Sequence, residues 1–113
     1  MEIKSLSSGV NLVKKTGKNN EYFTDLGEVK KGERKTFIVE FSSPSKIENP
    51  FATASCSSCT RAEIKQTEEN SFKVHITFTG KALGGVNKYV LVYVKTGGVK
   101  QMYRINFSGN VVR

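Results

Sequence analysis

The 113-residue sequence has few of the residues from which most catalytic and metal sites are built. It contains one histidine, two cysteines and no tryptophan. It also lacks a glycine-rich phosphate loop and a nucleophile elbow, and its one histidine cannot be matched to a nucleophile and an orienting acid. We therefore predict that the protein is not an enzyme and uses no cofactor.

Long hydrophobic runs are also missing. No stretch approaches the roughly 20 apolar residues of a membrane-spanning helix. The first 15 residues lack the apolar stretch and the small-residue cleavage site of a signal peptide. The content of 37% hydrophobic and 25% charged residues is typical of a folded soluble domain. We expect one domain with no membrane span and no export by that route.

Acidic residues are absent from the last third of the chain. Residues 1–69 hold 11 basic and 10 acidic side chains, whereas residues 70–113 hold seven basic and none that is acidic. Most of the net charge of +8 therefore lies in the C-terminal part. This asymmetry favours an acidic partner: nucleic acid, an anionic membrane or an acidic protein surface.

The clearest positive signal is hydrophobic alternation with a period of two. It is present in residues 34–42 and again in residues 71–80. The apolar positions of these two stretches are Phe37, Val39 and Phe41, and Phe72, Val74, Ile76 and Phe78. Both stretches predict half-buried strands, and turn residues separate such strands about every 8–12 residues. The pattern indicates an antiparallel β-sandwich.

The segment 88–109 predicts a β-hairpin. Gly97 and Gly98 readily adopt the positive φ angles of a two-residue type I′ turn, which places Thr96 opposite Val99. This register gives the hairpin one apolar face, made of Val90, Val92, Val94, Tyr103, Ile105 and Phe107. We expect this face to meet the core.

The opposite face of the hairpin is our candidate partner-binding site. It consists of Tyr89, Leu91, Tyr93, Met102, Arg104, Lys95 and Lys100. Only one face of an outer sheet normally meets the core, and large apolar side chains rimmed by cations are typical of a docking patch. Two alternatives stay open. The N-terminal segment around Val10, Leu12 and Val13 could cover this face as an extra strand, or a one-residue slip could exchange the two faces.

Cys56 and Cys59 stand three positions apart in the stretch ATASCSSCTRAEI. A structural zinc ion usually has four ligands, and His75 is the only further histidine or cysteine. A thioredoxin-type dithiol lies at a helix N-terminus, whereas this pair lies between two strand-like stretches. We predict no metal site and a structural role for the two cysteines, as free thiols or as a local disulfide.

Four stretches in order carry a family resemblance: DLGEVKKGERKTFIVEF, ATASCSSCTRAEI, FKVHITFTGKALGGVNKYVLVYVKT and YRINFSGNV. Over residues 22–112 the chain resembles uncharacterised bacterial Ig-like domains related to those of the ASPM and hydin proteins. The resemblance implies an all-β fold, an Ig-like antiparallel β-sandwich of about seven strands. This domain would occupy residues 22–113, with residues 1–21 as an N-terminal arm or extra strand. It also implies a non-enzymatic scaffold or interaction role, and supports a structural role for Cys56 and Cys59.

Small Ig-like domains with a basic, partly apolar face are often parts of larger assemblies, and tailed bacteriophages use such folds as capsid decoration proteins. We therefore predict a virion head auxiliary protein, assembled in the host cytoplasm, whose partner is a repeating capsid surface. One alternative is a protein-interaction domain of the bacterial envelope or cytoplasm. A second is a nucleic-acid-binding protein, since lysine, arginine and tyrosine suit phosphate contacts and base stacking. Self-association into a homo-oligomer is left open.

Overall fold

The computed structural model describes residues 1–15, 17 and 20–113, and these residues form nine β-strands and no helix. The strands are β1 (Glu2–Ser5), β2 (Val13–Lys14), β3 (Glu21–Lys30), β4 (Arg34–Ser42), β5 (Ile47–Ala54), β6 (Thr60–Glu68), β7 (Ser71–Thr79), β8 (Gly84–Thr96) and β9 (Val99–Val112). Within the described residues there is thus no helix that is long and apolar enough to cross a membrane.

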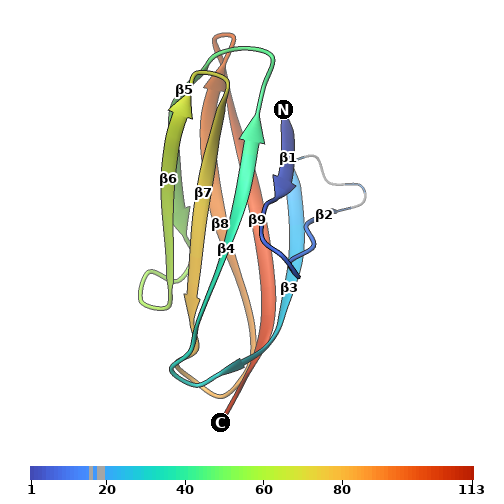
Figure 1. Cartoon of the computed structure of the whole chain (residues 1–113), viewed down its shortest axis with the longest axis vertical. Coiled ribbons are helices and arrows are strands. Elements are labelled where there is room, and N and C mark those ends of the chain that lie inside the picture. The colour runs from blue at the N-terminus through green and yellow to red at the C-terminus, as the bar shows by residue number, and fades with distance from the viewer. Residues whose placement is uncertain (16, 18–19) are drawn as a thin grey trace.

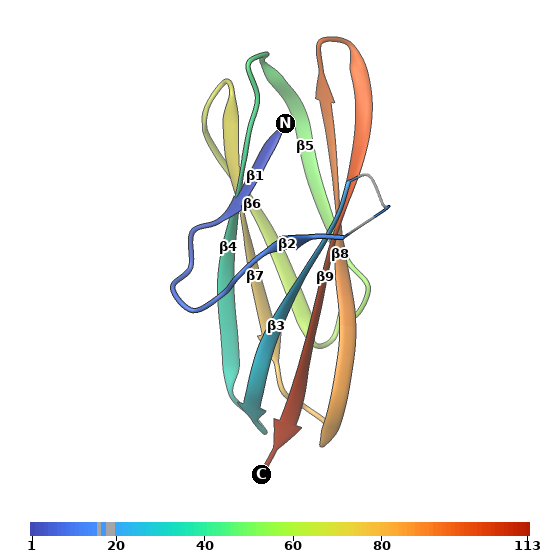
Figure 2. The same ribbon diagram turned by 90° about the vertical axis from the view of Figure 1, so that its right-hand side faces the viewer.

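The strands form two sheets that pack face to face (Figures 1 and 2). One sheet has the order β1-β4-β7-β6 and the other the order β2-β3-β9-β8-β5. All pairs are antiparallel except β3 with β9, which is parallel. Of the seven strands β3 to β9, three (β4, β7 and β6) form one sheet and four (β3, β9, β8 and β5) the other, and β1 and β2 add one short strand to each sheet. The predicted all-β sandwich is confirmed.

The core lies between the sheets and follows the alternation seen in the sequence. The seven apolar positions predicted in β4 and β7 all point inward and are at most 2% exposed. Phe41 stacks on Phe72 with ring centroids 4.8 Å apart, and it meets Tyr103 of the other sheet edge-on at 5.6 Å. These contacts join strands that are far apart in the sequence into one core.

The hairpin of β8 and β9 has the predicted register. Thr96 pairs with Val99, and Gly97 and Gly98 have φ angles of 55° and 79°. Both glycines thus adopt the left-handed conformation of a type I′ turn. All six side chains of the predicted apolar face are buried. No register slip has occurred, so the second face of the hairpin points away from the core.

The N-terminal segment joins both sheets. β1 pairs with β4, and the chain then crosses the side of the sandwich so that β2 pairs with β3 (Figure 2). Val10 and Leu12 are half-buried against the core on this crossing. Val13 lies in β2 and pairs with Phe23 at the sheet edge. This segment therefore widens the five-stranded sheet and does not form the predicted alternative cover over Tyr93, which is 39% exposed.

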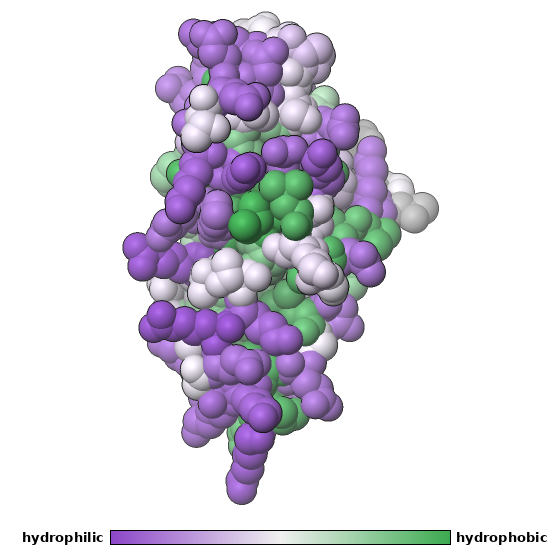
Figure 3. Space-filling view, viewed as in Figure 1, coloured by the Kyte–Doolittle hydropathy of each residue, from purple (hydrophilic) through white to green (hydrophobic). Residues whose placement is uncertain are grey.

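The outer face of the four-stranded sheet is largely hydrophilic, with one hydrophobic cluster near its centre (Figure 3). The hydroxyls of Thr36 and Thr77 lie 3.0 Å apart across two strands. The Nζ atom of Lys4 lies 3.5 Å from Oε1 of Glu40. This face therefore has the mixed polar surface that is usual for a solvated sheet.

Candidate functional site

The second face of the hairpin lies on the outer side of the five-stranded sheet, as predicted. Tyr93 pairs with Met102, Leu91 with Arg104, and Tyr89 with Asn106. Lys95 pairs with Lys100 next to the turn. The structure thus brings all seven predicted site residues together on one side of the sheet.

Neighbouring strands add apolar side chains that sequence reasoning missed. Phe51 of β5 pairs with Tyr93, and their ring centroids lie 6.2 Å apart. Phe23 of β3 pairs with Asn106 of β9, and Val13 of β2 pairs with Phe23. We call the combined surface the outer aromatic face; its members are Val13, Phe23, Phe51, Tyr89, Leu91, Tyr93 and Met102. Alternation could place these residues on a sheet face, but it could not show which strands lie side by side.

Most of the outer aromatic face is open to solvent. Five of its seven members are exposed large hydrophobic residues: Val13 and Phe51 at 60%, Met102 at 46%, and Phe23 and Tyr93 at 39%. Tyr89 and Leu91 are half-buried between them. A single exposed apolar residue is ordinary on a protein surface, whereas a contiguous group marks an interaction surface.

Arg104 lies at the centre of this face and is oriented by contacts with its neighbours. Its Cζ atom lies 3.8 Å from the centroid of the Tyr89 ring, which is a cation–π contact. Its Nε donates a hydrogen bond to Oδ1 of Asn106 at 2.8 Å. Asn106 is itself fixed, since its Nδ2 donates to the carbonyl oxygen of Tyr22 at 3.0 Å and to Oε1 of Glu21 at 3.3 Å. These contacts together orient the guanidinium group.

Two hollows open on the outer aromatic face. The larger, of about 500 Å³, is lined by residues of β2, β3, β8 and β9 that include Phe23, Tyr89 and Arg104. The smaller, of about 380 Å³, lies beside Tyr93, Lys95 and Lys100. Both have aromatic and cationic walls, so each suits a ligand that carries an apolar group next to an anion.

The two tyrosine hydroxyls with shifted pKa values do not point to acid–base chemistry. Burial raises the pKa of Tyr22, and burial together with the nearby Tyr22 hydroxyl raises the pKa of Tyr103. Tyr103 points into the core and its hydroxyl donates to the side-chain oxygen of Gln101. Both shifts keep the hydroxyls neutral near pH 7, as expected of structural residues.

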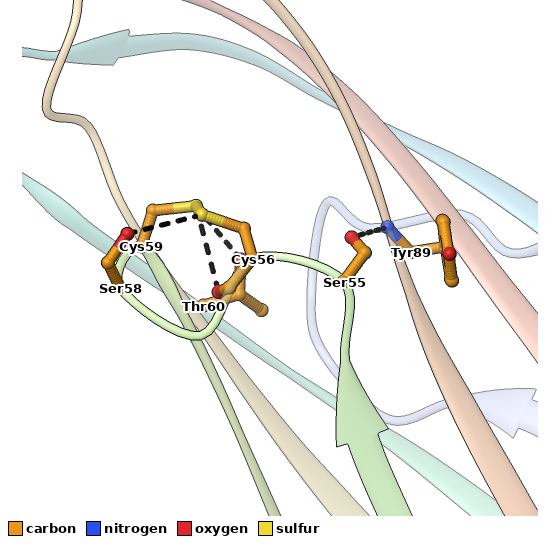
Figure 4. Close-up of a disulfide and its surroundings, with 6 residues drawn as sticks. All are labelled: Ser55, Cys56, Ser58, Cys59, Thr60 and Tyr89. Carbon is orange, nitrogen blue, oxygen red and sulfur yellow. Dashed lines mark hydrogen bonds between the residues drawn. A yellow bond between two sulfur atoms is a disulfide. The ribbon is translucent and has the colours of Figure 1, made fainter.

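Cys56 and Cys59 form a disulfide in the turn from β5 to β6, with Cα atoms 5.5 Å apart (Figure 4). Of the two structural forms left open by the sequence, the structure contains the bridged one. The turn is tied to the outer aromatic face through Ser55, because the Ser55 amide donates to the carbonyl of Tyr89 at 2.9 Å. In return, the Tyr89 amide donates to Oγ of Ser55 at 3.0 Å.

Removing the disulfide should lower the free energy of unfolding by about 2 kcal/mol, because the unfolded chain regains the freedom of a small closed loop. The measurement is urea denaturation of a Cys56→Ser, Cys59→Ser variant. Wild-type protein treated with dithiothreitol is the matched control and should give the same midpoint. Equal midpoints for the oxidised and reduced proteins would contradict a stabilising bridge.

Comparisons with known proteins assign no family to this chain. No family model and no curated protein matches it. A solved structure of an endo-fucoidan hydrolase from glycoside hydrolase family 107 is 12% identical to it with a TM-score of 0.46, over 80% of this chain and 13% of that one. Domains 4 and 5 of the S-layer protein SbsC are 16% identical with a TM-score of 0.38, over 100% of this chain and 52% of theirs. The chain is a β-sandwich domain that distantly resembles parts of these larger proteins.

Proposed function

We propose that this protein is a non-catalytic interaction module that binds an acidic protein surface through the outer aromatic face. The observation that carries the proposal is the set of exposed apolar side chains on the outer side of the five-stranded sheet. The core between the sheets is already complete without them. Aromatic side chains grouped in this way are the usual energetic centre of a protein–protein interface.

Charge supports an acidic partner. Lys95 and Lys100 lie at one end of the outer aromatic face, and Lys15 and Lys88 line the larger hollow with Arg104. The strands that contribute most of this face, β8 and β9, contain no acidic residue. Such a field attracts an acidic surface and speeds its association, while apolar contacts hold the complex.

The test begins with a pull-down, in which immobilised protein captures binding partners from an extract of the source cells. We expect a partner protein that binds to the wild type but not to a Phe51→Ser, Tyr93→Ser variant. In titrations with the purified partner, this variant should bind at least about 30-fold more weakly, since the loss of one hot-spot side chain already costs about that much and two are truncated. The control is Leu83→Ser, which changes a 47% exposed residue outside the face and should bind like the wild type. Equal binding of all three proteins would refute the proposed face.

Salt dependence separates this function from nucleic-acid binding. A site with about six phosphate contacts loses about 10³-fold in affinity between 50 and 200 mM salt. Docking through aromatic side chains should lose much less over this range. A steep linear fall of log affinity with log salt for an oligonucleotide, without binding of the protein partner, would favour the nucleic-acid alternative.

We further propose that the acidic partner is the repeating surface of a bacteriophage capsid. The resemblance to Ig-like domains and the cationic aromatic face support this narrower assignment by analogy of fold. The protein should then sediment with purified capsids, and the Phe51→Ser, Tyr93→Ser variant should stay in the supernatant. If the wild type stays in the supernatant as well, a partner in the bacterial envelope or cytoplasm is favoured.

A further inference from the structure

The larger hollow has two chemically different sides. Val13 and Phe23 form an apolar side on β2 and β3, and both are exposed. Arg104 and Tyr89 form the other side on β9 and β8, with Lys88 next to Tyr89 in the chain. A ligand that fits here needs an anionic group and an apolar group a short distance apart.

Arg104 is positioned to bind the anionic group of the ligand. The stack on Tyr89 and the bond from Nε to Asn106 hold its guanidinium plane in place. Among the described residues, neither Nη1 nor Nη2 has a hydrogen-bond acceptor, and the Glu21 carboxylate lies 3.9 Å away on the Nε side. A guanidinium group with both terminal nitrogens free can bind a carboxylate through two parallel hydrogen bonds. Because the side chain is already ordered, little rotamer entropy is lost on binding.

We infer that this hollow, between Arg104 and Phe23, binds an aspartate or glutamate side chain of the partner together with an adjacent apolar side chain. The carboxylate binds the terminal nitrogens of Arg104, and the apolar side chain lies against Val13 and Phe23. This inference rests on the proposed function and names the peptide chemistry that one part of the outer aromatic face recognises.

Local charge favours an acidic peptide over a nucleic acid strand. Glu21 accepts a hydrogen bond from Asn106 and lies 3.5 Å from Nζ of Lys15, so its carboxylate stands beside the hollow. A single carboxylate can approach Arg104 on the side away from Glu21. A continuous phosphate backbone brings a charge with every nucleotide, so more than one phosphate would have to lie near this carboxylate. In addition, Arg104 already covers one side of the Tyr89 ring, where a base would stack.

The experiment uses short peptides as probes of the full chain. An acetylated peptide Gly-Asp-Leu-Asp-Phe-Gly is titrated into ¹⁵N-labelled protein, and the amide signals of Phe23, Tyr89, Arg104 and Asn106 are followed. They should shift at millimolar peptide. A control peptide with asparagine at both aspartate positions has the same shape without the charge and should bind about tenfold more weakly. This comparison needs no protein variant and so does not depend on how a substitution folds.

Two variants test whether Arg104 is the residue that binds the peptide carboxylate. Arg104→Gln should weaken binding of the aspartate peptide about tenfold and remove its preference over the asparagine peptide. Arg104→Lys keeps the charge but loses the paired donors, and should restore only part of the affinity. Unchanged affinity in Arg104→Gln, equal binding of the two peptides, or binding of an oligothymidylate without binding of the aspartate peptide would each overturn the inference. None of these results changes the outcome of the partner-binding test with the Phe51→Ser, Tyr93→Ser variant, which decides the proposed function separately.

Discussion

Replacing Phe107 with alanine is expected to lower the free energy of unfolding by about 3–5 kcal/mol. The ring is 1% exposed and meets Phe37 and Phe78 edge-on, with centroids 5.9 and 5.7 Å away. Since these partners belong to the opposite sheet, truncation opens a cavity at the contact that holds the two sheets together. Urea denaturation, with the free energy extrapolated to water, measures the loss.

The matched control is Met102→Ala. Met102 lies on the same strand, β9, but on its outer side, and is 46% exposed. A large exposed side chain can be truncated with a change of about 0.5 kcal/mol or less. Similar losses for the two variants, or a larger loss for Met102→Ala, would mean that the two faces of the sheet have been assigned wrongly.

Alternation along single strands predicted most of the core, but Leu26, Val29, Ile47 and Val111 are buried as well and were not among the predicted positions. The inward positions of β4, β7, β8 and β9 follow from two rules. Side chains alternate between the two faces of a strand, and only one face of a sandwich sheet packs against the core while the other faces solvent. The glycine pair supplied the register of the hairpin, because a two-residue turn leaves one pairing of the flanking strands. Local geometry therefore contained most of the candidate site that lies on β8 and β9.

The remaining part of the candidate site depends on contacts between distant segments. Phe23 and Phe51 lie beside β9 and β8 only because β3 runs parallel to β9 and β5 pairs with β8. No local pattern encodes such neighbours. An extra strand in residues 1–21 was among the expectations, but its place in the sheets could not be predicted, since β1 has four residues and β2 has two, too few for a recognisable alternation. Whether Cys56 and Cys59 form a bridge depended on the approach of their Cα atoms, which spacing alone does not determine.

The double substitution Gly97→Val, Gly98→Val is expected to lower the free energy of unfolding by about 2–4 kcal/mol. Both residues have positive φ angles, a conformation that costs an L-residue roughly 1–2 kcal/mol. Added Cβ atoms would meet nothing within 4 Å at either position, so the loss comes from the backbone and not from a clash. Denaturation by urea, followed by circular dichroism, measures it.

Gly85→Val is the matched control, because Gly85 lies in β8 with open space around it and has no positive φ angle. Its stability should change by about 0.5 kcal/mol or less, since a β-branched residue suits an exposed strand position. A loss as large as that of the double variant would indicate that general crowding, and not the turn conformation, explains both results.

The turn also controls the docking surface, because side chains alternate along a strand. A shift of one residue in β8 would turn Tyr89, Leu91 and Tyr93 toward the core and bring its valines to the surface. A destabilised turn variant that keeps the native register should therefore still bind the acidic partner once conditions favour the folded state. A stably folded variant that no longer binds would indicate a changed register. Measuring stability and docking on the same turn variants thus separates the energetic role of the glycine pair from its role in directing the tyrosines to solvent.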